Sequence, residues 1–369
     1  MQIVYYAIGA LGLAILMVVH EAGHYFAARS YGMRVLKFSI GFGPTFFKVE
    51  PEDGYYWFTT FGRRVKLRMW KHIPEKHGPT VFQVAMIPVL AYVQIAGMNP
   101  MEPVDPKDKG SYANASLMGR IVTIFAGPLA NYLFASVFFF VSIFFGGKVF
   151  LSTDINVLPG KAAAAASIQD GDRIVALDGV PTDEWEKMAD IIAKSPNKPL
   201  AVVLDRNGQR VETVMTPTDE GGRGRVGVAA RGPGKRVPVT AGEAATLALV
   251  KPAHVVRDLV VGLSQYLRGR VDGELAGPAG IVKETARAAK SGWTDLMYLL
   301  GALSAYLGAF NLIPFPALDG MRLVFLGYEA TTRKRADAKF EQGVHAIGFA
   351  MLLCLVAWVT IFKDLGLGK

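Results

Sequence analysis

Two histidines with a glutamate between them form the stretch of this chain best suited to chemistry. They are His20, Glu21 and His24, in the order His-Glu-Ala-Gly-His. Residues four apart share one face of a helix, so both imidazoles could bind one metal ion. Glu21 could then act as general base toward an activated water, the chemistry of H-E-x-x-H zinc hydrolases. A chance pair of helical histidines is the alternative. The apolar run before the motif argues against it, because ionisable groups there are costly and usually functional.

A catalytic zinc usually needs a third protein ligand and one open position. Asp319 is a candidate, because it follows prolines at 314 and 316 that interrupt an apolar segment. Backbone broken at membrane depth should line a cavity. On the residues alone, however, the stronger interpretation is that Asp319 caps a helix starting near Met321. The remaining histidines offer no convincing ligand: His72, His77, His254 and His345.

Four apolar segments are long enough to enter a bilayer, at residues 3–28, 121–145, 293–312 and 344–362. Basic residues gather after the first segment and between the last two, which places both loops in the cytoplasm by the positive-inside rule. The termini and the insert 146–292 then lie outside. The histidine motif falls toward the cytoplasmic end of the first segment.

The composition agrees with membrane helices joined to a soluble domain. The chain is 51% hydrophobic, with a mean hydropathy of +0.28. Its net charge of +9 comes from basic residues that flank apolar segments, so we expect membrane orientation rather than binding to nucleic acid. Cys354 is the single cysteine and excludes an intramolecular disulfide.

Residues 35–40 and 55–61 are β-branched and aromatic, and turn-forming residues separate them at 41–44 and 51–54. They predict a β-hairpin or small sheet at the cytoplasmic membrane face. A strand edge there could hold an extended substrate, or the ribbon could only cover the helices. Residues 79–97 are apolar but contain Pro88, and we expect an interfacial or re-entrant segment.

Residues 152–230 show short alternating runs, Gly-Asp turns and an Asn207-Gly208 hairpin signal. Pro159 and Gly160 open a P-G-x-A-A pattern, and G-D-R-I-V-A-L-D-G follows at 171–179. These features resemble a PDZ domain of the permuted type found in bacterial proteases. The resemblance implies peptide binding near Pro159 and Gly160. A spacer that only filters by size is the alternative.

The second apolar segment contains Gly127-Pro128-Leu129-Ala130-Asn131. An intramembrane asparagine needs a hydrogen-bond partner, so Asn131 either joins two helices or lies beside a catalytic cleft.

Taken together, H-E-x-x-H, G-P-x-x-N, a PDZ-like insert and N-x-x-P-x-P-x-L-D-G resemble the site-2 protease family, in particular its bacterial regulator-of-sigma-E type. The resemblance implies one Zn²⁺ held by His20, His24 and Asp319, with Glu21 as base. It also implies that Asn131 and Asn311 position the substrate. Some members carry two PDZ domains, whereas this chain has room for one.

We therefore expect a polytopic α-helical membrane protein with about four transmembrane helices, a membrane-associated β-hairpin and an inserted α+β PDZ-like domain. The expected divisions are an N-terminal membrane domain (1–146), the PDZ-like domain (147–235), an amphipathic linker region (236–292) and a C-terminal membrane domain (293–369). The resemblance implies a multi-pass protein of the bacterial inner membrane. Its partners would be single-pass membrane proteins, for example a membrane-bound anti-sigma factor in regulated intramembrane proteolysis.

Two other classes of protein stay open. A non-catalytic scaffold could present the PDZ-like domain, although it would not need the histidine motif. A metal transporter could use intramembrane histidines, although no repeat symmetry is visible between the halves.

Overall fold

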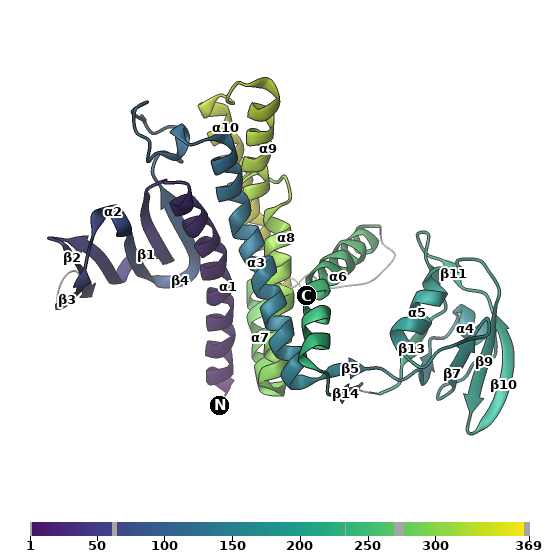
Figure 1. The fold of residues 1–369 in the computed structure, drawn as a ribbon. Helices are drawn as coiled ribbons and strands as arrows, with labels where there is room; N and C mark the ends of the chain where they lie inside the picture. The colour runs from purple at the N-terminus through teal and green to yellow at the C-terminus, as the bar shows by residue number, and fades with distance from the viewer. Residues whose placement is uncertain (1, 61–64, 233, 269–276, 365–369) are drawn as a thin grey trace. The chain divides into compact units, whose positions relative to one another are not determined.

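The computed structural model describes residues 2–60, 65–232, 234–268 and 277–364 (Figure 1). It divides into two compact units, which are described separately. One unit combines Met1–Ile143 with Gly242–Lys369, and the other is Phe144–Ala241. Residue 61 of the predicted second strand lies outside the described residues.

Among the described residues, three helices are long and apolar enough to cross a membrane. They are α1 (Gln2–Ser30), α3 (Leu117–Gly146) and α10 (Ala338–Val359), the last continued by η3 (Thr360–Asp364). The fourth expected span corresponds to α8 (Trp293–Asn311), which is not one of the three. Its small residues Gly301, Ser304 and Gly308 are buried against other helices, so α8 needs less apolar side-chain surface than a lipid-facing helix.

A four-stranded sheet lies against α1, in the order β3-β2-β1-β4 (Figure 1). Its strands are β1 (Val35–Glu52), β2 (Tyr55–Thr60), β3 (Val65–Lys71) and β4 (Val81–Ile95), with the short helix α2 (Pro74–His77) before β4. The two predicted strands are present, and the first continues to Glu52. Asp53 and Gly54 make the turn between them, both with positive φ.

The stretch 79–97, expected to be an interfacial or re-entrant segment, forms the strand β4 over Val81–Ile95. Pro88, which cannot donate to a sheet ladder, lies in the part of β4 between the two stretches that pair with β1, 81–87 and 91–95. The strand edge that could bind a substrate is also a different one from the edge of the predicted hairpin. Residues 37–40 of β1 pair with β4 at both 81–84 and 91–94, so β1 is enclosed and β4 forms the edge beside α1.

The remaining helices of this unit are η2 (Tyr112–Asn114), α6 (Ala241–Leu267), α7 (Pro278–Ser291) and α9 (Asp319–Thr332). Contacts join α1, α7 and α8, and Leu16, Leu296 and Leu300 form a buried cluster between α1 and α8. The buried Arg120 of α3 donates to both carboxylate oxygens of Glu329 on α9, at 2.6 and 2.8 Å. These contacts fix the helices that carry the histidines and Asp319 in one framework.

The second unit is a small α+β body. Its main sheet has the order β10-β9-β7-β8 and is formed by β7 (Arg173–Leu177), β8 (Val180–Pro181), β9 (Leu200–Arg206) and β10 (Gln209–Met215). Short strands pair around it: β5 (Lys148–Phe150) with β14 (Lys235–Val237), β6 (Ile155–Val157) with β13 (Val228–Ala230), and β11 (Thr218–Asp219) with β12 (Gly224–Arg225). The helices are α4 (Ala162–Ala165) and α5 (Trp185–Ala193). The predicted turn at Asn207-Gly208 joins β9 and β10, and both residues have positive φ.

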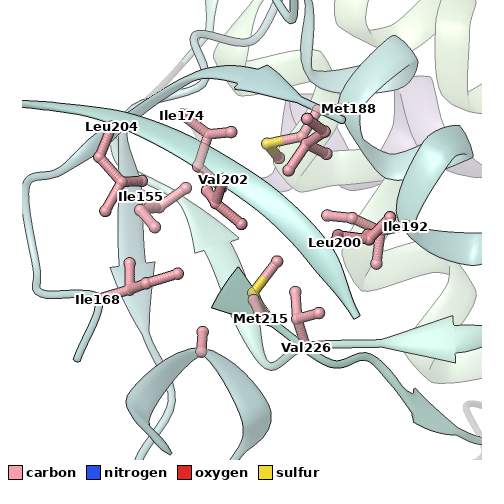
Figure 2. Packing of buried hydrophobic residues seen from close by; sticks show 12 residues of the cluster. Ile155, Ile168, Ile174, Met188, Ile192, Leu200, Val202, Leu204, Met215 and Val226 are labelled. Carbon is pink, nitrogen blue, oxygen red and sulfur yellow. The ribbon is translucent and has the colours of Figure 1, made fainter. Parts of the chain in front are cut away.

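Apolar residues from α5 and the main sheet form the core of this unit (Figure 2). Met188 and Ile192 of α5 pack toward Leu200 and Val202 of β9. The spacing of 188 and 192 places both on one helix face, which explains why α5 covers the sheet.

An ion pair beside this core gives the unit a pH-dependent stability. Both oxygens of the buried Asp172 carboxylate accept from the Arg206 guanidinium, at 2.8 and 2.7 Å. The backbone amide of Gln169 also donates to Asp172. The hydrogen bonds from Arg206 lower the pKa of Asp172 below its usual value. A lowered folded-state pKa contributes stability above the unfolded pKa, about 4, and loses it as pH falls through the folded value.

We therefore expect Asp172→Asn to lower the opening free energy of β7 and β9 by about 2 kcal/mol at pH 7. Hydrogen exchange in the full chain measures this. The difference from wild type should shrink as pH falls below about 4. Asp190→Asn, which breaks an exposed pair with Lys194 on α5, is the control and should change little. An equal effect of both substitutions would contradict the prediction.

Candidate metal centre

Close contact between α1 and α3 creates the space in which the histidines lie. A Cβ at Gly23 would stand 2.2 Å from the Ala126 carbonyl oxygen, and one at Gly127 would stand 2.3 Å from His24 Nε2. Neither position can therefore hold a side chain without moving α3 or the His24 ring. The glycine inside the histidine motif and the glycine of Gly127-Pro128 have one shared purpose, which is close packing of the two helices.

Three potential ligand atoms converge at this contact. His20 Nε2 lies 3.2 Å from His24 Nε2, and each lies 3.2 Å from Asp319 Oδ2. Both histidines are buried, and the Asp319 side chain is 17% exposed. Ligands about 2.0–2.1 Å from a tetrahedral zinc stand roughly 3.3–3.4 Å apart, so the triangle has the size of one tetrahedral face.

The environment of these atoms fits a cation. Asp319 Oδ2 is buried and, in the part of the chain that the structure describes, has no hydrogen-bond partner apart from the two imidazoles. Two imidazole nitrogens and a carboxylate oxygen are a usual donor set for Zn²⁺, and three such ligands leave a fourth position open. The residues present therefore fit the metal.

Asp319 does not serve as a helix cap. It is the first residue of α9, and the N-cap position is Leu318, which makes no side-chain cap hydrogen bond. The carboxylate faces the histidines instead. A Cβ at Gly320 would stand 2.2 Å from the Ile313 carbonyl oxygen, so the close approach of α9 to the preceding loop requires glycine there.

Hydrogen bonds to the outer ring nitrogens orient both imidazoles. His24 Nδ1 lies 2.8 Å from the Thr123 carbonyl oxygen, which can only accept. Nδ1 therefore carries the proton, and the lone pair of Nε2 is directed toward the metal position. His20 Nδ1 lies 3.1 Å from the Asn131 side-chain amide, at the atom assigned as Nδ2.

The Asn131 amide is best turned by 180°. As assigned, its Oδ1 is buried with no partner among the described residues, while its Nδ2 faces a nitrogen that must donate if His20 binds metal through Nε2. Amide oxygen and nitrogen are assigned from their partners. With Oδ1 toward His20, the asparagine accepts from Nδ1–H. The fully buried Asn131 therefore contacts His20, a candidate metal ligand. The sequence had suggested a different role for Asn131, which was to position the substrate.

We expect Asn131→Leu to raise the zinc dissociation constant about 10–100-fold, because His20 loses its outer acceptor. Asn131→Asp keeps an acceptor at the same place and should bind zinc close to the wild-type affinity. Competition with a chromophoric chelator measures both. Ser136→Ala, which removes a hydroxyl bonded to Tyr132 within the same helix, is the matched control. Wild-type affinity in Asn131→Leu would contradict the assignment.

Glu21 lies between the metal ligands and the sheet. Its carboxylate lies close to the charged groups of His20, His24 and Asp319 and near the backbone of Val93 on β4. The candidate base therefore adjoins both the metal position and the edge strand.

Among the described residues, no hydrogen bond or ion pair joins Asn311, Pro159 or Gly160 to the three ligand residues. Asn311 ends α8, and its amide donates to the Leu307 carbonyl oxygen at 3.0 Å. Pro159 and Gly160 belong to the other unit, on an exposed loop where Gly160 has φ +73°. A cavity of about 440 Å³ beside that loop is lined by Leu158 and Lys161 and by one face of α5.

Known proteins that are similar to this chain are zinc metalloproteases. The profile of peptidase family M50 matches residues 8–63 and 60–355. The zinc metalloprotease RasP of Geobacillus kaustophilus is 30% identical over 94% of this chain and 94% of its own. Candidate zinc metalloproteases of Rhizobium meliloti and Fusobacterium nucleatum are 28% and 26% identical, over 94% and 96% of this chain and 93% and 97% of theirs.

Proposed function

Since the chain belongs to peptidase family M50, the site-2 protease family, and is a zinc metallopeptidase with membrane-spanning helices, we propose that it cleaves single-pass membrane proteins within or near their membrane span. His20, His24 and Asp319 hold the Zn²⁺, and Glu21 is the catalytic base. The observation that carries the proposal is the 3.2 Å triangle of ligand atoms, formed at the end of an apolar helix.

In this reaction Glu21 takes a proton from the attacking water and delivers it to the leaving amine. The bound zinc supplies Lewis acidity, which activates the water and polarises the scissile carbonyl. Thr123 and Asn131 hold the two imidazoles in the ligating tautomer.

The substrate has to be extended, because a helical backbone shields its own carbonyls. We place it along β4, whose residue Val93 has its backbone near Glu21. Strand addition there would bring a peptide bond next to the base. Asn311, at the end of α8, would contact the same segment.

We further propose that α8 is a fourth span and that the β1–β4 sheet is associated with the membrane. The basic loops then place the metal centre toward the cytoplasmic side of a bacterial inner membrane. The unit Phe144–Ala241 is proposed to be a single PDZ-like domain on the outer side, with peptide bound in the cavity beside Pro159 and Gly160. A membrane-bound anti-sigma factor is a substrate of the proposed kind.

The test is cleavage by the purified chain in liposomes that contain a single-pass protein with one labelled span. We expect a cut within or next to the span, loss of cleavage with a zinc chelator, and recovery when zinc is added back. Mass spectrometry of the products locates the cut. A chain that retains zinc but cuts no membrane span would overturn the proposal, as would zinc transport into the vesicles without cleavage.

A further inference from the structure

The loop that delivers Asp319 has an unusual backbone. Between α8 and α9, Ala317 adopts φ +78°, a left-handed conformation that residues with a Cβ rarely adopt. Ala317 is two residues before Asp319, so its conformation sets the direction in which α9 and the carboxylate emerge. A segment held in such a conformation needs support from its surroundings.

That support comes from α10. The Ala317 amide donates to His345 Nδ1 at 3.1 Å. One turn further along, a Cβ at Gly348 would stand 2.1 Å from Pro316 Cβ, so this glycine lets α10 pack directly on the loop. Residues 345 and 348 share one face of the helix, and both touch the residues just before Asp319.

The His345 ring is itself held in place. It packs against the Phe325 ring of α9 with 5.9 Å between centroids. Because Nδ1 accepts from a backbone amide, the proton of the neutral ring is on Nε2, which is buried without a partner among the described residues. The ring borders a cavity of about 370 Å³ that is also lined by residues 92–95 of β4.

We propose that His345 is a positioning residue for the third metal ligand. Its Nδ1 holds the Ala317 amide, which keeps the loop in the conformation that directs Asp319 Oδ2 toward His20 and His24. His345 does not bind the metal. The inference rests on the proposed function, because it assigns Asp319 as a ligand.

A matched pair of substitutions separates the acceptor from the bulk of the ring. His345→Asn keeps an acceptor, because Oδ1 of asparagine takes the place of Nδ1, whereas His345→Leu has similar volume and no acceptor. We expect the leucine variant to bind zinc about 10-fold or more weakly, as for other outer partners of metal sites. The asparagine variant should stay close to wild type. His254→Leu, at an exposed position of α6, controls for the loss of a histidine.

The readouts are zinc affinity by chelator competition and the visible spectrum of the Co²⁺-substituted protein. In His345→Leu the Co²⁺ bands should move toward those of Asp319→Ala, since the first variant weakens coordination by the carboxylate that the second removes. Equal weakening in the leucine and asparagine variants, or wild-type spectra in both, would overturn the proposal. If Asp319→Ala itself retains zinc at wild-type affinity, the ligand assignment fails first, and the two failures are thereby distinguished.

Exchange of the Ala317 amide hydrogen provides a second measurement if the leucine variant does not fold. Protection of this amide in both wild type and His345→Asn supports the proposal. Rapid exchange in the wild-type protein overturns it.

Discussion

Glu21→Gln is expected to slow peptide cleavage by about 10²–10⁴-fold, the usual contribution of a general base. Glutamine keeps the length of the side chain and one oxygen, but it cannot take a proton from water. The three ligand atoms belong to other residues, so zinc should remain bound at the wild-type ratio. Single-turnover cleavage of a reconstituted single-pass substrate, with metal content measured on the same sample, tests both statements.

The control for this substitution is Glu284→Gln on α7, where the glutamate is exposed and pairs with Arg287. It makes the same chemical change away from the ligand triangle and should leave the rate unchanged. Cleavage at the wild-type rate in Glu21→Gln would remove Glu21 from the role of base. A parallel loss of zinc would instead assign the effect to the metal centre and leave the base undefined.

The histidine motif could be predicted from the sequence because its geometry is local. A helix fixes the relation between His20 and His24, and the apolar residues before them fix the helix. The same reasoning found the turns at Asp53-Gly54 and Asn207-Gly208, where few residue types tolerate positive φ.

Asp319 could not be selected from local pattern alone. A carboxylate after a proline-rich break is more readily explained as a helix cap than as a ligand, and only the family resemblance favoured the ligand. The tertiary structure decides between these alternatives, because Leu318 takes the cap position and leaves the carboxylate facing the histidines.

The partners around the site were harder still to predict. Thr123 acts through its backbone carbonyl, which every residue type possesses, so no residue pattern could indicate it. β4 was missed because an apolar stretch containing Pro88 is atypical of a strand inside a sheet. Its pairing with two parts of β1, and its contact with Glu21, arise from tertiary structure. The outer partner of His20 is Asn131, which sequence reasoning singled out for a different contact.

Asp319→Ala is expected to weaken zinc binding by more than the roughly 10–100-fold that loss of an outer partner brings. It removes one of three protein ligands and the anionic one, leaving two neutral imidazoles to hold a divalent cation. Asp319→Asn is the matched variant, because it keeps the size and one oxygen while removing the charge. It should fall between alanine and wild type, which separates the charge of the ligand from its presence. Zinc dissociation constants from chelator competition give the order.

A second consequence concerns stability, because the ligands join α1 to α9, near opposite ends of the chain. Metal that binds only the folded state stabilises it by RT ln(1 + [Zn]/Kd), about 2.7 kcal/mol at a hundred times Kd. Chelation should therefore lower the Tm of the wild-type protein and leave that of Asp319→Ala almost unchanged. If the two proteins lose the same Tm on chelation, the stabilising metal is bound elsewhere and Asp319 is not its ligand. If chelation lowers the Tm of the wild type alone, the Asp319 carboxylate contributes both to zinc affinity and to the stability gained when zinc joins α1 to α9.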